Sequence, residues 1–105
     1  MLGKSRRILL DSKLREILGS GNVYYRAPES KSLSYPAFKY KLSGIDEKHA
    51  DNKNYLNNVE YEVIYIGKDP DCDIHEVMLN EFEKIRWVRR YESNNLVHDV
   101  FYLYW

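Results

Sequence analysis

The chain has 105 residues, of which 16 are basic and 16 acidic, so its formal net charge at pH 7 is zero. This balance disfavours a nucleic-acid-binding role, because such proteins usually carry a basic excess that releases phosphate counterions. The single cysteine, Cys72, allows no internal disulfide and is too few for a structural zinc site. The length predicts one domain, residues 1–105, with a modest core to which a partner could add buried surface.

The N-terminal segment predicts an amphipathic helix rather than a membrane anchor. Four apolar residues recur at helical spacing between charged ones: Leu10, Leu14, Ile17 and Leu18. Gly19 or Gly21 is expected to end the helix, because glycine readily adopts the left-handed conformation that closes helices. Charges throughout the segment leave no apolar stretch for a signal peptide or a membrane span.

Three segments that follow have the residue pattern of β-strands. Residues 22–27, NVYYRA, predict a short strand ended by Pro28. Residues 34–45 alternate in the manner of a half-buried strand, with one face made of Phe38, Tyr40 and Leu42. Residues 59–67 alternate likewise, with one face made of Val59, Tyr61, Val63 and Tyr65. The strands at residues 34–45 and 59–67 are expected to pair with each other as an antiparallel hairpin.

The remaining residues predict a second helix and a final hairpin. Asp73 and Glu76 have the spacing of a capping box at a helix start. The helix would bury an apolar stripe of Ile74, Val77, Met78 and Phe82. Residues 85–93 and 96–105 predict two strands joined by turn residues at positions 94 and 95. The order of elements predicts an α+β fold, a mixed, mainly antiparallel sheet on which the N-terminal helix and the second helix pack.

No catalytic or metal-binding motif emerges from the sequence. Asp69, Asp71 and Asp73 alternate like the start of an EF-hand loop, but Ile74 and Asn80 stand where such a loop needs glycine and glutamate. The three histidines fall in three different segments without ligand spacing. We therefore expect a protein that is not an enzyme and that uses no metal or cofactor.

The basic segment RWVRR is a candidate docking cluster, made of Arg86, Arg89 and Arg90. Strand alternation predicts that Arg86 and Arg90 project together beside Val88, with Arg89 on the opposite face. Guanidinium groups placed in this way could reach phosphates or carboxylates on a partner.

Four segments, taken in order, resemble the tail completion, or tail terminator, proteins of long-tailed bacteriophages. They are VYYRAPES, YPAFKYKLSGIDEKHADNKNY, YEVIYIGKDPDCDIHEVM and HDVFYLYW, and the resemblance extends over most of the chain. It implies a mixed sheet flanked by helices and a structural role. Proteins of this kind form a ring, usually of six copies, on the head-proximal end of the tail tube. The ring stops tube polymerisation and offers a surface to the connector of the head.

The resemblance also implies the partners and the location of the protein. The partners would be further copies of the chain, the major tail tube protein and the head completion or connector protein. The protein would lie in the neck region of the virion, and in the host cytoplasm during assembly. Genomic DNA would pass through the ring without specific binding, and no membrane would be involved.

A long polar segment between the two central strands, residues 44–58, suits contact between subunits. A closed ring joins one patch of each subunit to a different patch of the next, and an extended hairpin arm can reach a neighbour. The mixed charge of the arm favours docking on complementary charges. The candidate contacts to an adjacent subunit or to the tail tube are Asp46, Glu47, Lys48, His49, Asp51, Asn52 and Lys53.

Two alternatives remain open at the level of sequence. The first is a head–tail connector or adaptor of the neck, one ring nearer the capsid, and copurification with tails that lack heads would argue against it. The second is a small nucleic-acid-binding regulatory protein that uses the three arginines of the basic segment with Trp87 and Tyr91. Salt-dependent binding to DNA or RNA would support that second alternative.

Overall fold

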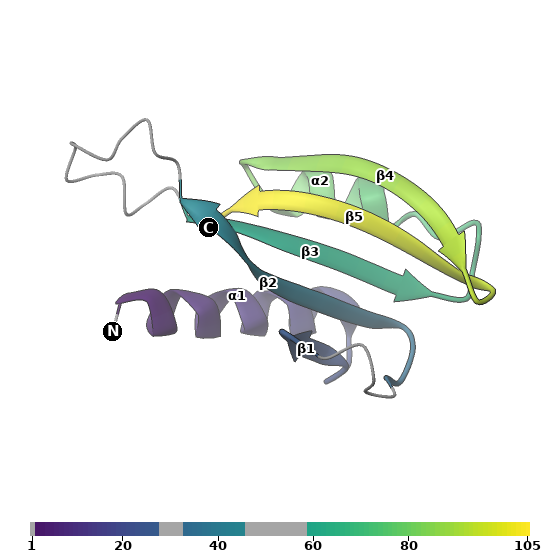
Figure 1. The fold of residues 1–105 in the computed structure, drawn as a ribbon, viewed down its shortest axis with the longest axis horizontal. Helices are drawn as coiled ribbons and strands as arrows, with labels where there is room; N and C mark the ends of the chain where they lie inside the picture. Colours follow the sequence, from purple (N-terminus) through teal and green to yellow (C-terminus); the bar gives the residue numbers. More distant parts are fainter. Residues whose placement is uncertain (1, 28–32, 46–58) are drawn as a thin grey trace.

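The computed structural model describes residues 2–27, 33–45 and 59–105. Within these ranges, two helices, α1 (Leu2–Leu18) and α2 (Ile74–Glu81), lie on the same face of a five-stranded sheet (Figure 1). The strands are β1 (Val23–Tyr25), β2 (Ala37–Ile45), β3 (Val59–Gly67), β4 (Ile85–Ser93) and β5 (Leu96–Tyr104). Their order across the sheet is β1-β2-β3-β5-β4, with β1 parallel to β2 and all other neighbours antiparallel. The predicted α+β fold with a mainly antiparallel sheet is confirmed.

The central hairpin pairs as its residue pattern predicts. β2 and β3 are antiparallel over their length, from Ala37 opposite Ile66 to Ile45 opposite Val59. Leu42 was expected on the buried face but is 47% exposed, next to an irregularity in the strand pairing. The candidate contacts in the arm, residues 46–53, lie outside the described residues, so their role stays a prediction.

Glycine and asparagine close two chain segments at the predicted places. Gly19 adopts a positive φ of 79° directly after α1, and its N–H donates to the carbonyl of Arg15 at 2.9 Å. Gly19 rather than Gly21 therefore ends the first helix. Asn94 and Asn95 have φ angles of 54° and 64°, the left-handed pair that a two-residue hairpin turn requires.

The second helix starts at the predicted position, but the predicted side-chain cap is not formed. α2 begins directly after Asp73, yet the Asp73 side chain makes no capping hydrogen bond, so the capping-box prediction was wrong. The backbone supplies the contacts instead. The N–H groups of Glu76 and Val77 donate to the Asp73 carbonyl at 3.0 and 3.3 Å, which closes the first turn without the side chain.

The core lies between the helices and the sheet face that they cover. α1 contributes Leu10 and Leu14, and α2 contributes Ile74 and Met78, as the helical spacing predicts. The strands contribute the side chains that alternate onto this face: Phe38, Tyr40, Tyr61, Val63, Tyr65, Phe101 and Leu103. The opposite face of the sheet is not covered by either helix (Figure 1).

Polar contacts attach α1 to β2 and to the residue that follows β5. The Tyr40 hydroxyl, on β2, donates to Asp11 at 2.7 Å, and Asp11 also accepts a hydrogen bond from Arg15. The indole N–H of Trp105 donates to the carbonyl of Arg6 at 3.0 Å, which joins the chain after β5 to the helix. Burial and the hydrogen bond to Asp11 both raise the pKa of Tyr40.

The free energy of unfolding should fall as the pH rises above 10.0, the ordinary pKa of tyrosine. Above this value the unfolded chain loses the Tyr40 proton, whereas the folded chain keeps it because its pKa is higher. The stabilisation from protonated Tyr40 is therefore complete below the ordinary pKa of tyrosine. It is lost as the pH rises toward the higher pKa that Tyr40 has in the folded protein. Urea unfolding between about pH 8 and about pH 11 measures this loss, and the free energy of unfolding should fall less for Tyr40→Phe than for the wild type. An equal fall in both proteins would contradict the assignment of the pH dependence to Tyr40.

Candidate functional site

The three arginines of the basic segment lie on the edge strand β4, and they are divided between the two faces of the sheet. The pairing of β4 with β5 shifts register between Trp87 and Arg89, so Val88 is an extra residue in the ladder. Arg86 and Arg89 consequently lie on the uncovered face, whereas Arg90 faces the helices. The prediction that Arg86 and Arg90 project together was wrong, because simple alternation does not hold across a bulge.

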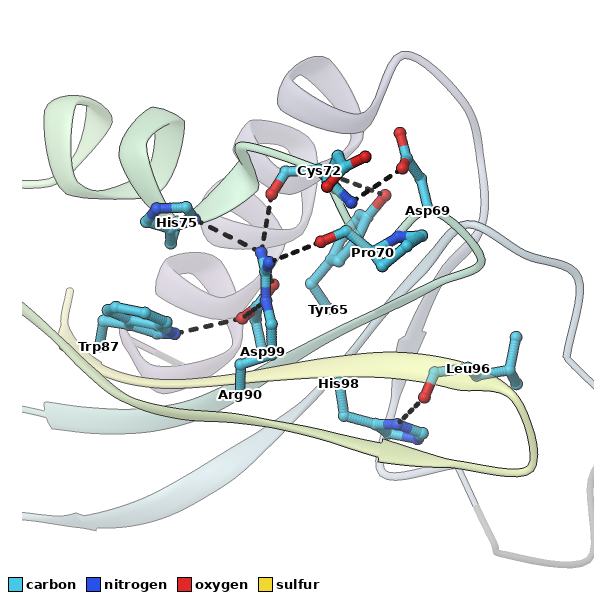
Figure 2. A network of polar contacts seen from close by, with 11 residues as sticks. Tyr65, Asp69, Pro70, Cys72, His75, Trp87, Arg90, Leu96, His98 and Asp99 are labelled. Carbon is cyan, nitrogen blue, oxygen red and sulfur yellow. Dashed lines mark hydrogen bonds and ion pairs between the residues drawn. The ribbon is translucent and has the colours of Figure 1, made fainter.

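Arg90 is the centre of an internal polar network (Figure 2). Its Nε and Nη2 atoms donate to both carboxylate oxygens of Asp99, at 2.8 and 2.9 Å, and Asp99 is fully buried. It also donates to the carbonyls of Pro70 and Cys72, at 3.1 and 2.7 Å, in the turn before α2. Trp87 gives Asp99 a third hydrogen bond, at 3.2 Å. Arg90 therefore joins two strands to that turn, and its guanidinium is engaged inside the subunit.

The ion pair with Asp99 keeps Arg90 charged. The hydrogen bond to Asp99 raises the pKa of Arg90, so the guanidinium stays charged at every physiological pH. A charge as deeply buried as that of Asp99 is tolerated only when it is paired and hydrogen-bonded. The network therefore has a structural role, since Arg90, Trp87 and Asp99 form their hydrogen bonds with one another and with the turn before α2.

The two histidines in the described ranges are packing residues, as the sequence suggested. His75 stacks on Trp87 with 4.7 Å between ring centroids, and its Nδ1 atom lies 3.4 Å from Arg90. Because a guanidinium can only donate, this nitrogen is the acceptor. His98 stacks on Tyr91, also at 4.7 Å. Among the described residues, no group of three potential ligands could hold a metal ion.

The sheet face opposite the helices, called the open face below, has an ordered arrangement of side chains. Cross-strand neighbours fall into rows that run from β2 across β3 and β5 to β4. Three such rows make up the surface: Lys41, Glu62, Tyr102 and Arg86; Lys39, Ile64, Val100 and Arg89; Ala37, Ile66, His98 and Tyr91. Basic residues end the first two rows on both sides. The centre is polar in the first row, at Glu62 and Tyr102, and apolar in the second, at Ile64 and Val100.

The first row is a continuous chain of polar contacts. The Tyr102 hydroxyl donates to Glu62 at 2.9 Å, and the Lys41 ammonium lies 3.8 Å from the same carboxylate. The Arg86 guanidinium lies 5.5 Å from the centroid of the Tyr102 ring. The hydrogen bond to Glu62 raises the pKa of Tyr102, so the phenol stays protonated at neutral pH. Glu62 thus organises the basic and aromatic side chains around it.

The apolar centre of the open face is only partly covered. Ile66 and Val100 are buried, at 5% and 6% exposure, whereas Ile64 is half-buried and Tyr91 is exposed. A hollow of about 460 Å³ opens over this region. It is lined by Arg26, Ala27, Lys39, Tyr40, Lys41, Glu62, Ile64 and Tyr91. An apolar floor with a basic and aromatic border can hold an apolar side chain that is flanked by carboxylates.

Sequence reasoning named Arg86 and Arg89 as docking candidates but not the lysines of the same surface. The alternation of residues 34–45 does place Lys39 and Lys41 opposite the buried side chains of β2. Alternation alone could not show that these lysines share a sheet face with Arg89, with two strands between them, because this depends on the order of strands in the sheet.

Comparison with protein-family models, with curated proteins and with solved structures found no match to this chain. In the described ranges, no helix is long and apolar enough to cross a membrane. What the protein does must therefore be inferred from its own surfaces, and the open face carries Arg86, Arg89, Tyr91 and Tyr102. Arginine and tyrosine are enriched in protein interfaces.

Replacing Arg90 by methionine should lower the free energy of unfolding by about 3–5 kcal/mol, because it leaves the Asp99 carboxylate buried without its partner. Arg89→Met is the matched control, because it makes the same substitution at the neighbouring residue on the open face. It should lower the free energy of unfolding by less than about 1 kcal/mol. Urea unfolding of both variants measures the difference. Equal losses would show that Arg90 has no structural role.

Proposed function

We propose that the protein is a structural assembly protein of the tail terminator type, forming a ring on the head-proximal end of a phage tail tube. The observation that carries the proposal is the open face, a sheet surface without a helix on it, where the half-buried Ile64 is bordered by arginine, lysine and tyrosine. Exposed apolar surface bordered by polar residues is typical of protein-binding sites. A subunit of a ring needs such surfaces on more than one side.

Two further features support the same proposal. The fold agrees with the mixed sheet flanked by helices that the family resemblance implies. The hairpin of β2 and β3 is built from strands of nine residues each, and residues 46–58 connect them. A hairpin of this length provides a base for the predicted arm contact with a neighbour.

The nucleic-acid alternative is weaker than it was at the level of sequence. One of its three arginines, Arg90, is held by Asp99, and the Glu62 carboxylate lies between the basic residues of the open face. A phosphate backbone placed across this surface would meet that negative charge. The connector alternative uses the same kind of surface and differs only in the partner that is bound.

Purified protein added to polymerising tail tubes without heads should bind at one tube end and stop elongation. Tubes grown without the protein should continue past the normal length. Electron microscopy of the tube ends and the distribution of tube lengths measure both effects. Binding to the portal end of capsids but not to tails would favour the connector instead. Salt-dependent DNA binding without tail binding would overturn the assembly role.

A further inference from the structure

The outer side of α2 carries acidic side chains, whereas the open face has a border of basic ones. Asp73, Glu76 and Leu79 follow one another at intervals of three residues, the spacing of one helix face. Ile74 and Met78 occupy the buried side of the same helix. Asp73 and Glu76 are exposed, and Leu79 is 43% exposed. These three residues, called the α2 stripe below, present carboxylates on one side of an exposed apolar side chain.

The α2 stripe and the hollow of the open face are complementary in charge and polarity. The floor of the hollow is apolar at Ile64, and its border carries the ammonium groups of Lys39 and Lys41. An isobutyl group such as that of Leu79 fits an apolar floor, while neighbouring carboxylates meet the basic border.

The two surfaces lie on opposite sides of the sheet. α2 lies on the same face of the sheet as α1 (Figure 1) and packs there through Ile74 and Met78. The hollow is lined by Lys39, Lys41 and Ile64, which alternate onto the other face. One copy therefore cannot place its own stripe in its own hollow. In a two-fold dimer each copy would have to turn both its stripe and its hollow toward the same partner, and surfaces on opposite sides of one sheet cannot do so. Repeated contacts of this kind run head to tail, and such chains close into rings or grow into filaments.

We propose that copies of this chain associate head to tail, with the α2 stripe of one copy docked in the open-face hollow of the next. The proposal rests on the proposed function, because it names the surfaces through which the ring would close. Glu62 lines the hollow and repels any anion, so the hollow favours an occupant that also fills its apolar floor at Ile64, as Leu79 of the stripe can, rather than a phosphate backbone.

Charge reversal of each surface tests this contact. The open-face variant carries Lys39→Glu and Lys41→Glu, and the stripe variant carries Glu76→Lys and Leu79→Lys. Each variant alone should self-associate about tenfold or more weakly than the wild type, because like charges would face each other across the contact. An equimolar mixture should regain part of the association, since the reversed hollow of one variant matches the reversed stripe of the other, while Leu79→Lys removes the isobutyl group from this contact. Analytical ultracentrifugation measures this with free protein, and ring occupancy measures it on tail tubes.

Matched controls separate the contact from a general effect of charge. Leu9→Lys with Glu16→Lys makes the same substitutions on the exposed side of α1, and Lys68→Glu with Lys84→Glu reverses two exposed lysines outside the hollow. Both controls should associate like the wild type. Wild-type association should also weaken as salt rises, because exposed charges are screened.

The outcomes separate this inference from the proposed function. Variants that assemble like the wild type, or a mixture of folded variants that does not regain association, would overturn the head-to-tail contact. If tube capping persisted in that case, the proposed function would stand. Copies that associate through the two surfaces but never cap a tube would overturn the proposed function alone. A protein that stays monomeric both when free and with tubes would overturn both.

Discussion

A buried carboxylate in the sheet constrains how the C-terminal half of the chain can fold. Asp99 has no exposed surface, so its charge must be compensated by residues that come from other parts of the structure. Arg90 provides the compensation and at the same time binds two carbonyls of the turn before α2. One ion pair thus fixes the β4–β5 hairpin against the turn from which the second helix starts.

The bulge at Val88 decides what remains for function. Without the extra residue, Arg90 would lie on the same face as Arg86, and Asp99 would lose its partner. With it, Arg90 enters the interior while Arg86 and Arg89 are left on the open face. The same local irregularity therefore stabilises the fold and gives the exposed surface its basic edge.

Both helices cover one side of the sheet, and this asymmetry connects the fold to the proposed assembly role. The covered side is filled by large apolar side chains, whereas the open face keeps a partly exposed apolar centre inside a charged border. The outer side of α2, beyond the covered face, is acidic. A domain with a basic hollow on one side and an acidic helix on the other is suited to repeated contacts in one direction, as a ring requires.

Much of the architecture could be predicted because it depends on local patterns. The alternation in β3, the helical spacing of Leu10 and Leu14, and the asparagine pair after β4 each specify their structure over a few residues. The bulge could not be predicted, since nothing in RWVRR marks where the extra residue falls. The pairing of Arg90 with Asp99 was missed for the same reason, because it follows from the register that the bulge creates.

The central claim is that the open face becomes a protein contact on assembly, and lysine reactivity measures it most directly. Acetylation of the free protein and of the assembled ring, read residue by residue by mass spectrometry, compares Lys39 and Lys41 with Lys68 and Lys84. The latter pair does not line the hollow and serves as an internal reference. If the open face is a contact, Lys39 and Lys41 should lose most of their reactivity on assembly while the reference pair keeps its own. Unchanged reactivity of Lys39 and Lys41 in a formed ring would contradict the claim.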